Sequence, residues 1–400
     1  MAKIPQLIEL RAGQPVYRGY VLSPSGGWTY LISNAIPDEL VIAKIVEQRR
    51  DYSIATTHKV LEPSQDRIAP LCSVYGTCGG CHYQHITYSR QVEMKQQVLQ
   101  DCLRRISKID PPLITTLCGE QWNYRHRASF KVKEDIVGFY KANSREIVAI
   151  RECPLMRPEI NDTLHHLTSL DWNGFTGQIE VITGEDTLIT AIPEKGSQLP
   201  ARIKRQIQEV GLGAKNKQYL TLDLNGGVYT VSHQTFFQAN WALNRQVLDF
   251  LRNTLNIRGK RVIDLYAGAG NFSLGLLWDA QSVIAYEENQ QAIEDARRNA
   301  RLRGLTNCKF IQSKTEDIKP LIGVDLAIVN PPRTGLTRRA IEVLIALKAE
   351  ELVYMSCDPA TFSRDIGRLK RHYDIRSLLL IDFFPQTYHI ETLGILKKGA

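Results

Sequence analysis

Residues 261–396 alternate between short apolar runs and helix-forming segments, and this alternation restricts the possible folds more than any other feature. Helical periodicity fills the gaps between the runs, as in residues 290–303, a segment that Gly304 ends. The seven β-prone runs are 261–265, 282–286, 308–312, 325–329, 352–356, 376–381 and 391–396. The pattern predicts an α/β doubly wound, Rossmann-like domain with a mostly parallel sheet and a final antiparallel pair at its edge. We place this domain at residues 231–400 and expect helix 241–256 near its start.

The first loop of this domain has the spacing of a nucleotide-binding turn. Gly268 and Gly270 form a G-x-G pattern before Asn271 and let the backbone come close to a ligand. Glu287 ends the second run, where an acidic side chain can accept hydrogen bonds from ribose hydroxyls. The third glycine of the dinucleotide fingerprint is missing. The loop therefore favours an adenosine-sized site and S-adenosyl-L-methionine as the cofactor.

Cys357 lies between the run 352–356 and a segment, 359–370, that is predicted to be helical. Asp358 is a natural N-cap and Pro359 a natural first helical residue. The carboxyl edge of an open α/β sheet binds ligands, and a helix N-terminus favours a thiolate, which is the nucleophilic form of cysteine. Cys357 is therefore a candidate nucleophile. This window alone also fits a buried structural cysteine.

Four further cysteines have the spacing of a ligand set. Cys72, Cys78 and Cys81 form a C-x₅-C-x₂-C triplet, and Cys153-Pro154 follows about seventy residues later. Four thiolates suit zinc or an iron–sulfur cluster. Structural zinc usually uses two C-x₂-C pairs, so a triplet with one distant cysteine favours a 4Fe–4S cluster. Zinc and unligated thiols remain the alternatives.

The first 230 residues predict two further domains. Four short β-rich runs (15–22, 28–32, 39–47 and 53–61) indicate a small N-terminal β-barrel over residues 1–62, a common platform for nucleic acids. Residues 63–230 form the cluster-bearing α+β middle region, with a helix at 88–106 and a hairpin over 122–141. The hairpin interleaves cations such as Arg125 and Arg127 with aromatic residues such as Phe139, as binding to single-stranded RNA requires. A solvated sheet face explains the same pattern equally well.

Composition agrees with a nucleic-acid partner without proving one. The formal net charge is +8, and hydrophobic residues make up 43% of the chain. No apolar run approaches the 18 residues of a membrane span, and the N-terminus lacks the apolar core of a signal peptide. We therefore expect a cytoplasmic protein with no membrane partner.

With these motifs assembled, the chain resembles the RNA uracil-carbon-5 methyltransferase family, specifically the 23S rRNA type with a TRAM module and an iron–sulfur cluster. The resemblance rests on the cysteine triplet with Cys153, on Phe-Phe-Gln238-Ala-Asn240, on Ser-Cys357-Asp-Pro and on the 382–391 segment that ends in Glu391. It implies that Cys357 is the nucleophile and Glu391 the base. The implied cofactor residues are Gln238, Tyr266, Glu287 and Asn330, with Arg333 near the target uracil. It also implies a monomer that acts on 23S rRNA, with tRNA as the alternative substrate.

The implied reaction explains why a thiol and a carboxylate are both needed. Addition of a thiolate to carbon 6 of uracil makes carbon 5 nucleophilic enough to accept a methyl group. A base must then remove the carbon-5 proton so that the cysteine can leave.

Two positions depart from the family pattern, and two other functions have to be weighed. Asn330 stands where Asp is common, which removes a charge near the cofactor, and Ala267 stands where Cys is common. An amino-group methyltransferase would also use Asn-Pro-Pro, but an aromatic residue would follow where this chain has Arg333. A non-catalytic RNA-binding protein is the other alternative. The presence of both Cys357 and Glu391 argues against it.

Overall fold

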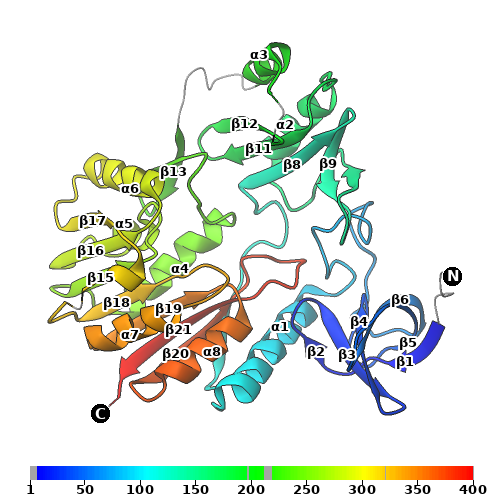
Figure 1. The fold of residues 1–400 in the computed structure, drawn as a ribbon, viewed down its shortest axis with the longest axis horizontal. Helices are drawn as coiled ribbons and strands as arrows, with labels where there is room; N and C mark the ends of the chain where they lie inside the picture. Colours follow the sequence, from blue (N-terminus) through cyan, green and yellow to red (C-terminus); the bar gives the residue numbers. More distant parts are fainter. Residues whose placement is uncertain (1–6, 196–197, 211–218, 320, 400) are drawn as a thin grey trace.

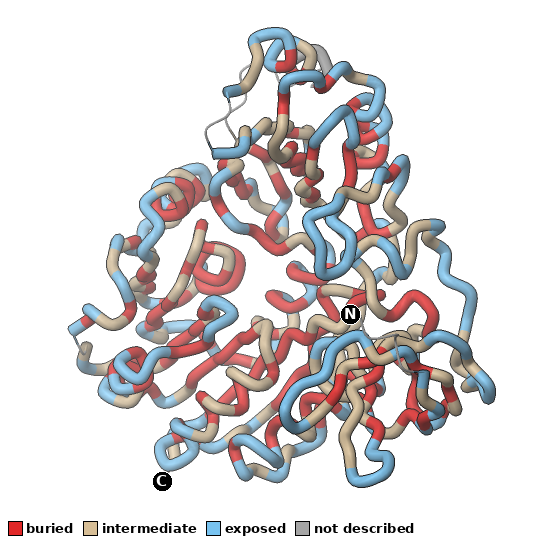
Figure 2. Tube along the Cα trace, turned by 45° about the vertical axis from the view of Figure 1, so that its right-hand side comes forward, coloured by how far each residue is buried: buried red, intermediate tan, exposed pale blue. Residues whose placement is uncertain are grey.

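The computed structural model describes residues 7–195, 198–210, 219–319 and 321–399 (Figure 1). Within these residues the strands form sheets of six, five, two and eight members. The buried residues concentrate along the strands and the helices packed on them (Figure 2). No helix in the described ranges is long and apolar enough to cross a membrane.

The eight-stranded sheet confirms the predicted doubly wound domain. Its order is β17-β16-β15-β18-β19-β21-β20-β7, and only β21 runs antiparallel to its neighbours. The strands are β7 (Ile114–Leu117), β15 (Arg261–Leu265), β16 (Ser282–Glu287), β17 (Cys308–Gln312), β18 (Leu326–Val329), β19 (Glu351–Ser356), β20 (Tyr373–Ile381) and β21 (Glu391–Lys398). The helices of this domain are α4 (Trp241–Thr254), α5 (Asn271–Gly275), α6 (Gln290–Leu302), α7 (Arg338–Leu347) and α8 (Pro359–Leu369).

The predicted antiparallel pair is present, but its position at the edge is wrong. β21 lies between β19 and β20, and β7 pairs in parallel outside β20. β7 comes from the predicted middle region, as does α1 (Tyr88–Cys102), which continues as a π-helical turn, η1 (Leu103–Ser107), and packs with it against α8. Residues 88–117 therefore belong spatially to the C-terminal sheet, while the domain limits at 62 and 230 stay predictions.

The N-terminal strands form an open ladder among the described residues, so the predicted barrel is not confirmed. In the order β1-β5-β6-β4-β3-β2, the edge strands β1 and β2 each pair with one neighbouring strand and not with each other. The strands are β1 (Leu7–Arg11), β2 (Pro15–Val16), β3 (Tyr20–Ser25), β4 (Trp28–Ser33), β5 (Leu40–Gln48) and β6 (Ser53–Glu62). Alternate residues such as Val21, Ile32 and Val41 build a separate small core.

The middle sheet is antiparallel throughout and confirms the predicted hairpin. Its order is β10-β9-β8-β11-β12, and β8 pairs with β9. Its elements are β8 (Arg127–Lys133), β9 (Ile136–Tyr140), β10 (Ile147–Ala149), β11 (Gly177–Thr183), β12 (Thr187–Pro193), α2 (Pro158–Thr168) and α3 (Ala201–Val210). The two-stranded sheet of β13 (Tyr219–Leu224) and β14 (Gly227–Ser232) lies against α6.

Candidate active site

The turn at Cys357 has the local structure that its sequence predicts. β19 ends at Ser356, and the Asp358 carboxylate accepts hydrogen bonds from the backbone N–H groups of Ala360 (3.0 Å) and Thr361 (2.9 Å). Pro359 is the first residue of α8. These contacts fix the peptide of Cys357 between a strand end and a helix start.

Strand register places Glu391 opposite Cys357. β19 and β21 are antiparallel, and Ser356 pairs with Thr392. One step further along both strands, Cys357 and Glu391 face each other at the same edge of the sheet. The insertion of β21 next to β19 therefore creates this pair, which an edge position for β21 would have separated.

Burial dominates the electrostatics of the pair. Glu391 is 5% exposed, and burial raises the pKa of its carboxyl to about 8, against the opposing effect of Arg333. Burial, followed by the nearby Glu391, raises the pKa of the Cys357 thiol to about 11, although Arg333 favours the thiolate. In the chain without substrate, burial therefore outweighs the effect of Arg333 and favours the thiol form of Cys357.

Arg333 lies in the Asn330-Pro-Pro-Arg333 turn after β18. It provides the positive charge near Cys357 and Glu391. Its charge acts on Cys357, Glu391 and His389, so the predicted nucleophile, base and substrate-binding arginine come together. Arg333 is exposed toward a cavity and does not form an ion pair with a described carboxylate. It is free to contact an incoming substrate.

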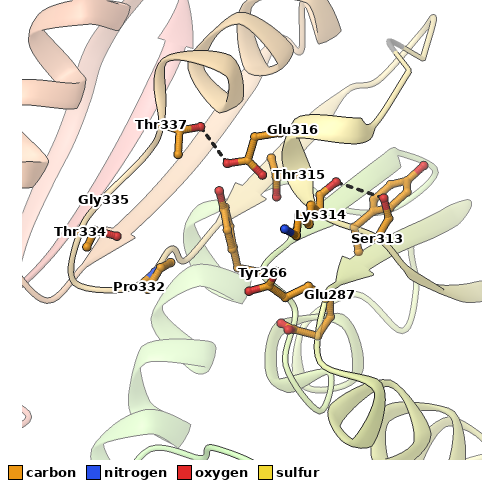
Figure 3. A pocket seen from close by; sticks show the side chains of 12 residues that line it. Tyr266, Glu287, Ser313, Lys314, Thr315, Glu316, Pro332, Thr334, Gly335 and Thr337 are labelled. Carbon is orange, nitrogen blue, oxygen red and sulfur yellow. Dashed lines mark hydrogen bonds between the residues drawn. The ribbon is translucent and has the colours of Figure 1, made fainter.

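A pocket of about 410 Å³ lies at the carboxyl ends of β15, β16 and β17 (Figure 3). Tyr266 has a left-handed backbone (φ 59°), and its ring stands between Glu316 and Glu287. The Glu287 carboxylate accepts hydrogen bonds from Gly268 N–H (3.0 Å) and Asn289 N–H (2.8 Å), which ties the first loop to the end of β16. Tyr266 and Glu287 therefore line the pocket as predicted for a nucleotide site.

A larger cavity of about 1700 Å³ adjoins this pocket, and Thr334 lines both. Its walls come from three regions of the chain. They include Tyr17, Arg18 and Arg49 from the N-terminal region, Cys72, Cys78, Cys81, Arg125, Lys131, Phe139, Lys141 and Cys153 from the middle region, and Arg333, Asp358 and His389 from the C-terminal domain. Asp358 follows Cys357, and His389 precedes Glu391 by two positions, so the wall of this cavity includes close sequence neighbours of both candidate residues.

Comparison with known proteins identifies the class of enzyme. The family model described as tRNA (Uracil-5-)-methyltransferase matches residues 208–399. An uncharacterized RNA methyltransferase of Aquifex aeolicus is 33% identical over 98% of both chains. The 23S rRNA (uracil(1939)-C(5))-methyltransferase RlmD of Histophilus somni is 30% identical over 96% of this chain and 94% of its own. The chain belongs to the RNA (uracil-5-)-methyltransferase family.

A solved structure agrees with the fold of this methyltransferase over nearly its whole length. The Pyrococcus abyssi tRNA (uracil-54, C5)-methyltransferase, in complex with S-adenosyl-L-homocysteine, superimposes with a TM-score of 0.78 over 97% of this chain and 100% of its own. The two sequences are 22% identical, so the likeness concerns the fold.

The other predicted cofactor residues do not line the small pocket of the methyltransferase. Asn271 forms a reciprocal amide pair with Asn244 (2.8 and 3.0 Å), and Asn330 donates its N–H to the Leu265 carbonyl at 3.4 Å. Gly268 (φ 56°) and Gly270 (φ 85°) shape the first loop, and Gln238 is buried before α4. Sequence reasoning missed Ser313, Lys314, Thr315, Glu316 and Thr337, which line the pocket from two loops without a recognisable motif.

The three predicted RNA-contact residues of the middle region have different environments. Arg125 lines the large cavity, and its Nε lacks a hydrogen-bond partner in the described structure. Phe139 also lines this cavity and stacks on Phe130 with ring centroids 5.3 Å apart. Arg127 instead pairs with Glu180 at 2.6 Å and donates to two carbonyl groups of the segment before α4. Its position favours a structural role.

The four predicted cluster cysteines lie along one cavity, but the structure does not confirm a metal site. Cys72, Cys78, Cys81 and Cys153 are all free, and within the described residues no group of three or more His, Cys, Asp or Glu side chains is arranged to hold a metal ion. Their charges nevertheless act on one another, and burial raises the pKa of the Cys81 thiol to about 12 and that of Cys153 to about 11. The side chain of Asn161 holds the Cys153 backbone through two hydrogen bonds.

Proposed function

We propose that this methyltransferase transfers a methyl group from S-adenosyl-L-methionine to carbon 5 of a uridine in 23S rRNA. The observation that carries the proposal is the closeness of Cys357 and Glu391 at the ends of the paired strands β19 and β21, where the charge of Arg333 acts on both. The activity named for the Histophilus somni relative supports 23S rRNA as the substrate. The activity of the Pyrococcus abyssi structure makes tRNA the alternative.

The chemistry follows from the two side chains. The Cys357 thiol loses its proton to water, and the resulting thiolate adds to carbon 6 of the uracil and leaves carbon 5 with enolate character. Arg333 offsets the negative charge on the sulfur before addition. After carbon 5 has accepted the methyl group, Glu391 removes the remaining proton, the carbon 5–carbon 6 double bond re-forms and the Cys357 thiolate leaves. A carboxyl with a pKa near 8 is a strong enough base for this step.

The small pocket suits the adenosine part of the cofactor. Glu287 can accept hydrogen bonds from ribose hydroxyls, and Tyr266 offers a flat surface to the adenine. We include Gln238, Gly268, Gly270, Asn271 and Asn330 in the proposed cofactor site, where Asn330 contributes an amide at a position that commonly carries a charge in the family. The cofactor supplies a methyl group attached to a positively charged sulfur.

The large cavity suits a folded RNA. Cationic side chains from three regions line it, and phosphates bind such surfaces through counterion release. A paired or stacked uridine must swing out of its helix to reach Cys357. Phe139 and other aromatic residues of the wall can stack on unpaired bases.

We also propose that Cys72, Cys78, Cys81 and Cys153 hold a 4Fe–4S cluster with a structural role. Their four-thiol donor set fits such a cluster, and all four cysteines line the same cavity. Protein purified without oxygen should contain about four irons per chain, and Cys153→Ser should lose iron. Stoichiometric zinc with negligible iron would contradict the cluster.

The substrate proposal is tested with the full chain, S-adenosyl-L-methionine labelled in its methyl group, a 23S rRNA fragment and an unmodified tRNA. We expect label in 5-methyluridine of the 23S fragment at a rate well above that for tRNA. Faster methylation of tRNA would contradict 23S rRNA as the substrate and favour tRNA. Label in any base position other than uracil carbon 5 would overturn the proposed chemistry.

A further inference from the structure

Tyr17 belongs to the N-terminal sheet by sequence but, half-buried, packs against the hydrophobic cluster of the C-terminal domain. It lies in the turn between β2 and β3, and its ring contacts the C-terminal hydrophobic cluster rather than that of its own sheet. Its hydroxyl donates to the carbonyl oxygen of Cys357 at 3.5 Å, across 340 residues of sequence. The contact reaches the peptide of the nucleophile itself.

Tyr388 makes the corresponding contact in the opposite direction, from the C-terminal domain to the N-terminal sheet. It lies between β20 and β21, three positions before Glu391, yet it packs against the core of the N-terminal sheet. The rings of Tyr17 and Tyr388 meet edge to face with centroids 5.8 Å apart, and His82 lies 4.4 Å from Tyr388 on another side. Each module therefore packs one half-buried tyrosine against the hydrophobic cluster of the other.

The turn that carries Tyr17 is closely fitted. Arg18 has a left-handed backbone (φ 74°), a conformation that a residue with a side chain adopts only when its surroundings hold it there. A Cβ atom added to Gly19 would lie 3.4 Å from Tyr388 and 3.6 Å from His82, so little free space separates the turn from the segment that leads to Glu391. Such packing fixes the direction of Tyr17 toward Cys357.

We propose that Tyr17 is a positioning residue of the active site, which holds the Cys357 peptide and the Tyr388 segment so that nucleophile and base keep their mutual geometry. The inference rests on the proposed roles of Cys357 and Glu391. Under this proposal, the N-terminal sheet contributes to catalysis through Tyr17 and also forms part of the wall of the large cavity. Burial and the charge of Asp358 raise the pKa of Tyr17 above its ordinary value, so the hydroxyl stays protonated and able to donate.

The test separates turnover from RNA binding in the full-length enzyme. Tyr17→Phe removes only the hydroxyl and keeps the ring between the modules. We expect kcat at saturating RNA and cofactor to fall about threefold to tenfold, as for one neutral hydrogen bond, with KM for RNA within about twofold of the wild type. Tyr30→Phe is the matched control, because it removes a hydroxyl from a half-buried tyrosine of the same sheet that lines neither cavity.

A second readout isolates the chemical steps. RNA with 5-fluorouridine at the target cannot lose a proton from carbon 5, so the covalent adduct accumulates and its rate of formation reports addition and methyl transfer. Tyr17→Phe should form this adduct about threefold to tenfold more slowly than the wild type at saturating substrates, while Tyr30→Phe should match the wild type.

The outcomes distinguish the inference from the function on which it rests. An unchanged adduct rate and kcat in Tyr17→Phe would overturn the positioning role, as would a raised KM with unchanged kcat, which would mark Tyr17 as an RNA contact. Equal slowing in Tyr30→Phe would also overturn it. Adduct that still forms in Cys357→Ala would instead overturn the proposed nucleophile.

Discussion

The two cavities beside the catalytic pair are built in different ways. The small pocket takes its walls from loops at the carboxyl ends of neighbouring strands in one sheet. The large cavity takes its walls from the N-terminal sheet, the cysteine-rich segment, the middle sheet and the C-terminal domain. Under the proposed assignment of the two cavities, cofactor binding on the small-pocket side depends on one domain, whereas catalysis on the large-cavity, RNA side depends on how all the modules are held together.

Cys357→Ala should produce the largest difference between the cofactor side, meaning binding in the small pocket, and the RNA side, meaning reaction on RNA from the large cavity. Methyl transfer should fall by about 10⁶-fold or below detection, as when the nucleophile of another covalent enzyme is removed. The dissociation constant of the cofactor, measured by calorimetry, should stay within about twofold because Cys357 does not line the small pocket. Cys308→Ala, which removes a thiol from the same sheet outside both cavities, should keep activity. A parallel loss of cofactor affinity would contradict the independence of the two sides.

Lys95→Met should show how strongly the RNA side depends on long-range packing. Lys95 is 1% exposed and pairs at 2.7 Å with Asp382, which is fully buried in the segment that leads to Glu391. Removal of the cation leaves an unpaired buried carboxylate, and the free energy of unfolding should fall by about 3–5 kcal/mol in urea denaturation.

The exposed pair of Lys398 with Glu350 supplies the control for this change. Lys398→Met should cost about 0–1 kcal/mol. The double change Lys95→Met with Asp382→Leu should recover much of the loss, because no unpaired charge remains. A loss below about 1 kcal/mol for Lys95→Met alone would mean that this pair does not hold the segment.

Glu287→Gln should act on the cofactor side alone. It weakens an acceptor that binds Gly268 N–H and faces the small pocket, so cofactor affinity should fall about tenfold, with KM for RNA nearly unchanged. Titration calorimetry and steady-state kinetics measure the two quantities. Glu294→Gln on the exposed face of α6 is the control. A comparable rise in KM for RNA would show that the two cavities are not separable at this residue.

The kcat/KM for RNA should depend on pH, whereas the affinity for the cofactor should not. Glu391 must be deprotonated to act as a base, and its pKa is about 8 in the free enzyme. Cys357 must also lose its proton to act as a nucleophile, and its pKa is about 11. The kcat/KM for RNA should therefore rise as pH increases from 6 to 9, by up to about tenfold per pH unit for each of these two groups while the pH is below its pKa. Cofactor affinity should not follow this rise, because neither Glu391 nor Cys357 lines the small pocket. A flat profile of kcat/KM would contradict the assignment of Glu391.

The sequence predicts the local features of this molecule well. The strands of the C-terminal sheet and the capped start of α8 follow from apolar periodicity and from Asp358-Pro359, which act over a few residues. The small pocket is half predicted, since Tyr266 and Glu287 belong to recognisable patterns and the 313–316 loop does not.

The long-range features escape such reasoning for physical reasons. The strand order depends on packing between whole elements, so the place of β21 and the addition of β7 are not encoded in either short run. The raised pKa of Cys357 comes from burial by distant segments, which local sequence does not report. The contact of Tyr17 with Cys357 joins two modules that carry no pairing signal in their motifs.

The role of the Cys357 and Glu391 pair is tested most directly by Glu391→Gln with RNA and S-adenosyl-L-methionine. Addition and methyl transfer should proceed, while elimination stalls because no carboxylate removes the carbon-5 proton. A denaturing gel should then show a protein–RNA band that is absent when Cys357→Ala is added to the same chain. Turnover at the wild-type rate without such a band would contradict the account and assign proton removal to another group.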